Sequence, residues 1–161
     1  MLASILILIV FVSANPYYDK VLLSEVTDLI LRNGELTVGR KNKPIQHLNC
    51  EYPPADSQLN DELRQADCQY GPQYIKCRNC GKNILLSDSD FIWECVGYGM
   101  TPGYILTNGQ IGCEGYDYPD DPYILKGSCW ISYKVYERPK YQYYYDHLTV
   151  SNYFLSKQIY R

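Results

Sequence analysis

The stretch GYILTNGQIGCE, residues 103–114, carries the strongest local signal for the fold of this 161-residue chain. It places Asn108-Gly109 between two apolar runs. Asn and Gly both tolerate the positive φ angles of a type I′ turn, so this pair predicts a β-hairpin. Asn33-Gly34 stands in the same setting, between residues 29–32 and 35–40, and predicts a second hairpin.

Other segments alternate in the way that strands do. Residues 91–96, FIWECV, place Trp93 and Cys95 on one face, and residues 129–136 alternate in the same manner. The 18 tyrosines suit the half-exposed faces of a sheet, because a buried tyrosine hydroxyl needs a hydrogen-bond partner. We predict an all-β domain of antiparallel hairpins over residues 20–137. A Tyr-rich tail over residues 138–161 follows outside the core, and its residues 149–159 are compatible with a short helix.

An apolar leader precedes the predicted domain. Residues 5–12, ILILIVFV, are too few to span a bilayer and fit the apolar region of a secretory signal peptide. Small residues end at Ala14, so we expect a signal peptide over residues 1–14 rather than a buried N-terminal strand. No second apolar run of bilayer length follows, and the mature chain as written is expected to be soluble in the lumen or secreted.

Seven cysteines follow the leader, and their density in an exported chain predicts disulfides. The number is odd, so at least one thiol has no partner within the chain. Cys77 and Cys80 form a C-x-x-C motif, which in other settings marks a redox pair or a zinc site. Here a turn at residues 81–83 follows the motif rather than a helix, and an oxidising lumen favours disulfides over a metal.

Acidic residues gather in one short segment, whose carboxylates are a weak candidate for a calcium site: Glu114, Asp117, Asp120 and Asp121. The spacing is not that of an EF-hand, and Pro119 and Pro122 favour a solvated acidic turn. The net charge of -3 does not indicate a nucleic-acid partner. His47 and His147 are the only histidines, and neither accompanies a nucleophile motif, so we predict no catalytic residues and no cofactor.

Several segments, in order, resemble the lumenal domain of the store-operated calcium entry-associated regulatory factor family. They are VLLSEVTDL at 21–29, HLNC at 47–50, IKCRN at 75–79, IWEC at 92–95, CEGYD at 113–117 and YILKGSC at 123–129. The resemblance covers residues 21–137, and its most specific part is 113–129. It implies an all-β domain stapled by disulfides, in a protein of the endoplasmic reticulum that slows calcium entry after the stores refill. The implied partner is a store sensor of the stromal interaction molecule type.

The resemblance also sorts the cysteines. Six match the family pattern and are expected to form a structural disulfide framework, with fifteen pairings open: Cys50, Cys68, Cys77, Cys95, Cys113 and Cys129. Cys80 is the additional one. We expect it to stay free or to bridge two chains, which would make a homodimer.

The chain also departs from the family pattern, which continues into a transmembrane helix and a cytosolic tail. The sequence in hand stops at Arg161, so we expect either an incomplete gene model or a soluble relative. The prediction is a non-enzymatic negative regulator of store-operated calcium entry. The alternatives are a secreted disulfide-rich binding protein without a calcium role and a lumenal thiol oxidoreductase that uses Cys77 and Cys80.

Overall fold

Among the residues that the structure describes, the regular structure consists of β-strands and two short 3₁₀ turns, which confirms the predicted all-β class. The computed structural model describes residues 19–52, 65–82 and 91–138, together with the backbone of a strand at 153–160. The predicted signal peptide lies outside these residues. The strands are β1 (Lys20–Leu22), β2 (Asp28–Arg32), β3 (Leu48–Cys50), β4 (Tyr74–Lys82), β5 (Phe91–Tyr98), β6 (Tyr104–Cys113), β7 (Tyr123–Leu125), β8 (Trp130–Glu137) and β9 (Tyr153–Tyr160), and the turns are η1 (Leu23–Glu25) and η2 (Cys68–Tyr70).

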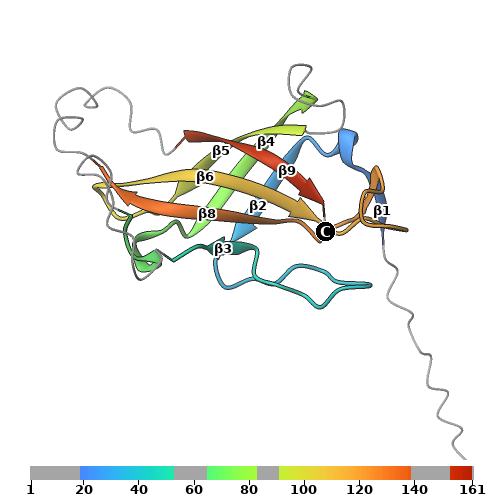
Figure 1. Ribbon diagram of the computed structural model, residues 1–161, viewed down its shortest axis with the longest axis horizontal. Coiled ribbons are helices and arrows are strands. Elements are labelled where there is room, and N and C mark those ends of the chain that lie inside the picture. The colour runs from blue at the N-terminus through green and yellow to red at the C-terminus, as the bar shows by residue number, and fades with distance from the viewer. Residues whose placement is uncertain (1–18, 53–64, 83–90, 139–152, 161) are drawn as a thin grey trace, which may run out of the picture.

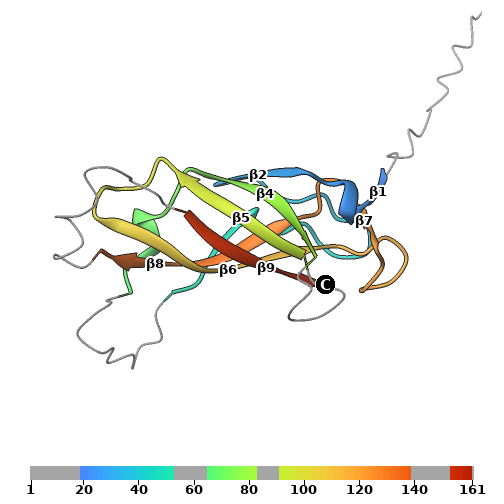
Figure 2. The same cartoon turned by 90° about the horizontal axis from the view of Figure 1, so that it is seen from above.

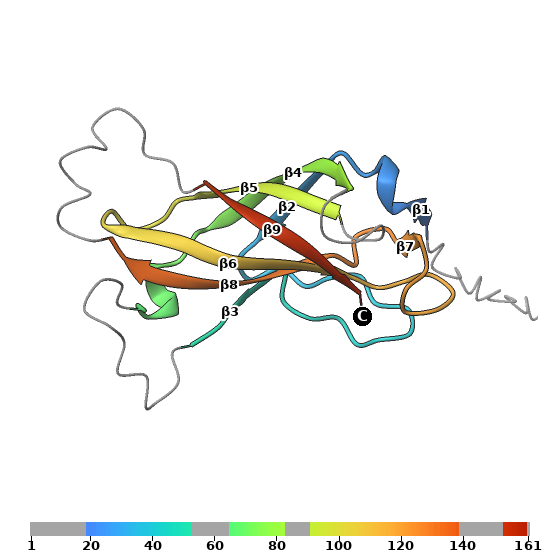
Figure 3. The ribbon, with the colours of Figure 1, turned by 45° about the horizontal axis from the view of Figure 1, so that its top comes forward.

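Seven of the strands form one sheet in the order β2-β4-β5-β9-β6-β8-β3 (Figure 1). Neighbouring strands run antiparallel except at β6–β9 and β3–β8, which are parallel. The two remaining strands, β1 and β7, pair antiparallel in a separate ribbon. Figures 2 and 3 show that the large sheet curves, so that β2 and β4 lie across the core from β8.

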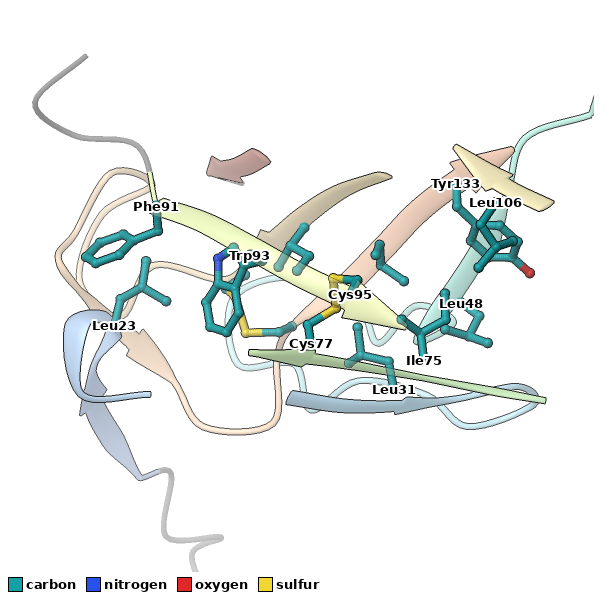
Figure 4. Packing of buried hydrophobic residues seen from close by; sticks show 14 of the residues in the cluster. Leu23, Leu31, Leu48, Ile75, Cys77, Phe91, Trp93, Cys95, Leu106 and Tyr133 are labelled. Atoms are coloured by element: carbon teal, nitrogen blue, oxygen red, sulfur yellow. A yellow bond between two sulfur atoms is a disulfide. The ribbon is translucent and has the colours of Figure 1, made fainter. Parts of the chain in front are cut away.

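One hydrophobic core fills the inner side of this curved sheet. On β5 the alternation predicted from the sequence is confirmed, because Trp93 and Cys95 are both fully buried. Figure 4 shows Leu23 of η1 beside Phe91, and Ile75 of β4 near Leu48 of β3. A large apolar side chain such as that of Leu23 or Ile75 stabilises the fold by about 1.5–3 kcal/mol when it is fully buried.

The hairpin predicted at Asn108-Gly109 is wrong. β6 continues through these residues, and its ladder with β8 shifts register by one residue between Thr107 and Gln110. Such a shift is a β-bulge, in which one strand absorbs an extra residue. The long β8 offers a partner to both halves of β6, so the chain does not need to reverse here. The reversal before β6 uses Gly99 and Gly103, both at positive φ.

A turn does form at Asn33-Gly34, with Gly34 at a φ of 79°, but the predicted hairpin is wrong in its pairing. β2 pairs instead with β4, and this pairing places the apolar side chains of β2 against the core. The segment after the turn pairs instead with residues just ahead of β3, through the bridge of Leu36 with Gln46. We call residues 35–47 the arm.

The C-terminal segment differs from the predicted tail. Residues 153–160 form β9, which lies inside the sheet between β5 and β6, and they do not form the short helix considered for 149–159. The sequence YFLSKQIY is rich in residues that favour strands, and neighbours on both sides satisfy its backbone hydrogen bonds. Residues 139–152 of the predicted tail lie outside the described residues.

Candidate functional site

The structure joins six cysteines in three disulfides, Cys50–Cys68, Cys77–Cys95 and Cys113–Cys129. These are the six cysteines that the family resemblance assigns to a structural framework. Cys80 is a free, exposed cysteine.

Strand register explains two of these bridges. Cys77 on β4 lies directly opposite Cys95 on β5, and their Cα atoms are 4.0 Å apart. Figure 4 shows this disulfide inside the core. Cys113 and Cys129 continue the β6–β8 register one step beyond the pair Gly112–Trp130, again with a Cα separation of 4.0 Å. The third bridge joins the end of β3 to η2.

The geometry around Cys80 argues against a dithiol centre in the C-x-x-C motif. Both cysteines belong to β4, where Cys77 is fully buried and bonded to Cys95. Cys80 is exposed, and its Sγ lies 3.8 Å from the carbonyl oxygen of Arg78. A redox pair needs both thiols of the motif, and here Cys77 is already bonded to Cys95.

The densest group of polar contacts lies where the arm meets the loop between β6 and β7. At its centre the carboxylate of Glu114 accepts hydrogen bonds from three consecutive backbone N–H groups, those of Arg40, Lys41 and Asn42, at 2.7–3.4 Å. Successive N–H groups of this kind form a nest that binds anions. Glu114 is only 4% exposed. This contact therefore fixes the arm to the end of β6.

Cations and aromatic rings surround this contact. The Arg40 guanidinium lies 4.0 Å from the centre of the Tyr116 ring and donates to the Tyr116 carbonyl oxygen. The Lys20 ammonium lies 4.9 Å from the Tyr116 ring and 4.8 Å from the Tyr123 ring. It also forms a 2.6 Å ion pair with Asp117, whose hydrogen bond raises the pKa of Lys20. Cation–π contacts of this kind add modest stability at exposed sites.

The acidic residues proposed for calcium have other partners. The Asp121 carboxylate accepts hydrogen bonds from the backbone N–H groups of Tyr123 and Asp117. Burial alone would raise the pKa of Asp121, but these two hydrogen bonds together with the charges of Lys20 and Lys41 outweigh it, and the pKa is lowered. No group of three or more His, Cys, Asp or Glu side chains within the described residues is arranged to hold a metal ion.

The expected solvated acidic turn is wrong for two of its four residues. Glu114 and Asp121 are almost fully buried, whereas Asp117 and Asp120 are exposed. The carboxylates of Glu114 and Asp121 accept hydrogen bonds from backbone N–H groups. Hydrogen bonds to an ionised acceptor are stronger than those between neutral groups. We call the connected set the polar junction: Lys20, Arg40, Glu114, Tyr116, Asp117 and Asp121.

Sequence reasoning missed the two cations of the polar junction. Arg40 stands 74 residues from Glu114, and Lys20 stands 97 residues from Asp117. Neither carries a local pattern, since the contacts depend on how the arm and β1 fold back onto the loop. The polar junction ties three separate segments of the chain together.

A small cavity next to the polar junction has a volume of about 10 Å³ and is lined by Thr37, Ser128 and Trp130, among others. That volume holds about one water molecule. This cavity is therefore too small for an organic ligand.

His47 lies at the end of the arm. Its Nδ1 accepts a long hydrogen bond of 3.5 Å from the Arg32 N–H and lies 3.7 Å from a carboxylate oxygen of Glu35. Burial lowers the pKa of His47, and the Glu35 charge opposes that shift. His147 lies outside the described residues. No nucleophile accompanies His47 in these contacts.

In the part of the chain that the structure describes, no helix has the length and apolar character needed to cross a membrane.

Comparison with known proteins identifies the relatives of this chain. The family described as SOCE-associated regulatory factor of calcium homoeostasis matches residues 1–158. Several relatives bear the name store-operated calcium entry-associated regulatory factor, including the following three. The Dictyostelium discoideum protein is 34% identical over 117 residues, the Xenopus laevis protein 31% over 117 residues, and the Homo sapiens protein 30% over 117 residues.

Each of these alignments covers 73% of this chain but only 32%, 34% and 30% of the respective relative. The chain therefore matches about a third of the length of these curated relatives.

Proposed function

Because this chain belongs to the family of store-operated calcium entry-associated regulatory factors, we propose that it is a regulator of store-operated calcium entry. The role is negative: the protein limits calcium refilling once the stores are replete. It acts without catalysis, as the lumenal domain of a protein of the endoplasmic reticulum. The observation that carries this proposal is the family match across residues 1–158.

Two features support a lumenal location. The leader has the length and composition of a signal peptide, and three disulfides are typical of domains that fold in an oxidising compartment. The cytosol keeps thiols reduced, and there the fold would lose all three bridges.

The proposed partner is a store sensor of the stromal interaction molecule type. The support for this partner is the family resemblance alone. The relatives are about three times as long as the matched region, so the comparison covers only part of each of them. The all-β domain would then present a rigid surface on the lumenal side. Co-precipitation of the store sensor with the tagged protein tests this partner separately from the calcium role.

The direct experiment removes the gene from cells that express the protein. After store depletion and refilling, calcium entry should decline more slowly in the disrupted cells than in the parent cells. An unchanged decline would contradict the proposed role.

The location is tested with the same tagged protein. Retention in the endoplasmic reticulum agrees with the regulator. Recovery of the protein from the culture medium would favour the secreted binding protein instead.

A further inference from the structure

The three disulfides differ sharply in their access to solvent. Cys77, Cys95 and Cys113 are fully buried, and Cys129 is 3% exposed. Cys50 and Cys68 are both half-buried. Thiol–disulfide exchange requires a thiolate to reach a sulfur atom, so access governs which bridge exchanges first. Only the Cys50–Cys68 bridge meets this requirement without opening of the sheet.

The ends of the segment between Cys50 and Cys68 are also held to β8 by hydrogen bonds. The Glu51 N–H donates to the Tyr133 carbonyl at 2.8 Å, and the Ala66 N–H donates to the Val135 carbonyl at 2.7 Å. The Gln65 side-chain amide donates to the Glu51 carbonyl at 2.8 Å, which links the two ends directly. These hydrogen bonds do not depend on the disulfide. They therefore hold both ends of the segment to β8 when the disulfide opens.

The other two bridges stand in a different position. Cys77–Cys95 joins two neighbouring strands inside the core, and Cys113–Cys129 sits where β6 and β8 meet the polar junction. A reductant reaches these sulfurs only after strands separate, and the free energy of that opening approaches the free energy of global unfolding.

We propose that Cys50–Cys68 is a redox-labile bridge, opened and closed by a dithiol oxidoreductase while the domain stays folded. The thiolate of the dithiol attacks one sulfur, forms a mixed disulfide and releases the other cysteine as a thiolate that takes up a proton. The second thiol of the dithiol then resolves the mixed disulfide. Two electrons pass to the protein, which gains two thiols, and the dithiol becomes a disulfide. The proposal does not rest on the calcium role.

Differential alkylation tests this order. The purified full chain is treated under native conditions with increasing dithiothreitol, and the thiols formed are alkylated. The protein is then denatured, fully reduced and labelled with a heavier reagent for peptide mass mapping. Cys80 is free and exposed, so it is alkylated from the start and serves as the internal control for labelling. Cys50 and Cys68 should open at least about tenfold faster than the four buried cysteines. Simultaneous opening of all three bridges, or earlier opening of a buried one, would overturn the proposal.

A second measurement separates local opening from unfolding. Near-ultraviolet circular dichroism of the partly reduced protein should keep the signal of the buried Trp93 and Trp130. The double variant Cys50→Ser/Cys68→Ser should keep it as well, and the matched Cys77→Ser/Cys95→Ser should lose it. Loss of the signal in the Cys50→Ser/Cys68→Ser variant would show that the bridge is required for folding and would overturn the proposed switch.

Discussion

The carboxylate of Glu114 accepts a 2.7 Å hydrogen bond from the backbone N–H of Lys41, across 73 residues of sequence. The adjacent N–H groups of Arg40 and Asn42 point at the same carboxylate. A carboxylate offers several acceptor positions and no donor, which suits a nest of N–H groups. The position of the arm therefore depends on the charge and shape of this single side chain.

Replacement of Glu114 by Gln should destabilise the protein. The amide keeps the size of the side chain but puts an NH₂ donor against backbone donors, which leaves buried groups unsatisfied. We expect a loss of about 1–3 kcal/mol in the free energy of unfolding, measured by chemical denaturation. The matched variant Asp120→Asn removes an exposed charge from the same loop and should stay within about 0.5 kcal/mol of the parent protein. Equal stability of the two variants would contradict the role of the nest.

Close packing of Trp130 on Gly112 makes a second prediction. A Cβ atom at Gly112 would lie 2.1 Å from the Trp130 ring, so Gly112→Ala forces the ring or the strand to move. Overpacking of this kind costs about 1–3 kcal/mol. As the control, Gly34→Ala meets no atom within 4 Å and carries only the strain of its positive φ, about 1 kcal/mol. Thermal unfolding of both variants should rank Gly112→Ala as the less stable, and the reverse order would refute this packing.

Two disulfides offer a matched comparison, because Cys50–Cys68 and Cys77–Cys95 both close loops with a sequence separation of 18. The chain-entropy contribution should thus be the same, about 3 kcal/mol for each. Replacing Cys77 and Cys95 by Ala also leaves space in the core, which adds ~1–2 kcal/mol to the loss. Urea denaturation of the two double Ala variants should reveal this difference. Equal losses would mean that the burial of Cys77 and Cys95 adds nothing to stability.

His47 makes the stability depend on pH. Burial lowers its pKa below the ordinary 6.5, so the folded state binds fewer protons than the unfolded state near and below that pH. The stability that neutral His47 contributes is present above pH 6.5 and is lost as the pH falls below it. Protonation also removes the Nδ1 acceptor of the Arg32 N–H.

The variant His47→Asn tests this dependence, because its side-chain oxygen replaces the Nδ1 acceptor without titrating. Stability curves from pH 7.5 to 5 should fall more steeply for the parent protein than for the variant. Parallel curves would show that His47 does not carry the pH dependence. Asp121 acts in a separate window, since its lowered pKa affects stability only as the pH falls below 3.8.

Local patterns predicted much of this fold. The alternation in residues 91–96 marked β5, because side chains on a strand with one buried face repeat every second residue. Residues 129–136 were also predicted as a strand, but β8 is buried on both faces from Trp130 to Tyr133 and does not alternate there. The same local reasoning failed at Asn108-Gly109, where the length of β8 outweighed the preference of the pair for a turn. It failed again for β9, because polar residues surround a segment that gains its stability from two distant neighbours.

The polar junction could not be predicted from local sequence patterns for a similar reason. The acidic segment was visible in the sequence, but nothing near it indicated that Glu114 and Asp121 would be buried. Their partners come from the arm and from the backbone of their own loop, which only the tertiary fold brings together.

We propose above that this protein is a negative regulator of store-operated calcium entry. The most direct test of this role is complementation of cells that lack the protein, with calcium entry recorded after the stores refill. The parent protein should restore the fast decline of entry. A Cys77→Ser/Cys95→Ser variant, in which the core bridge is lost, should not restore it at the same level of expression. Failure of the parent protein to restore the decline, or equal rescue by a variant shown to be unfolded, would contradict the account.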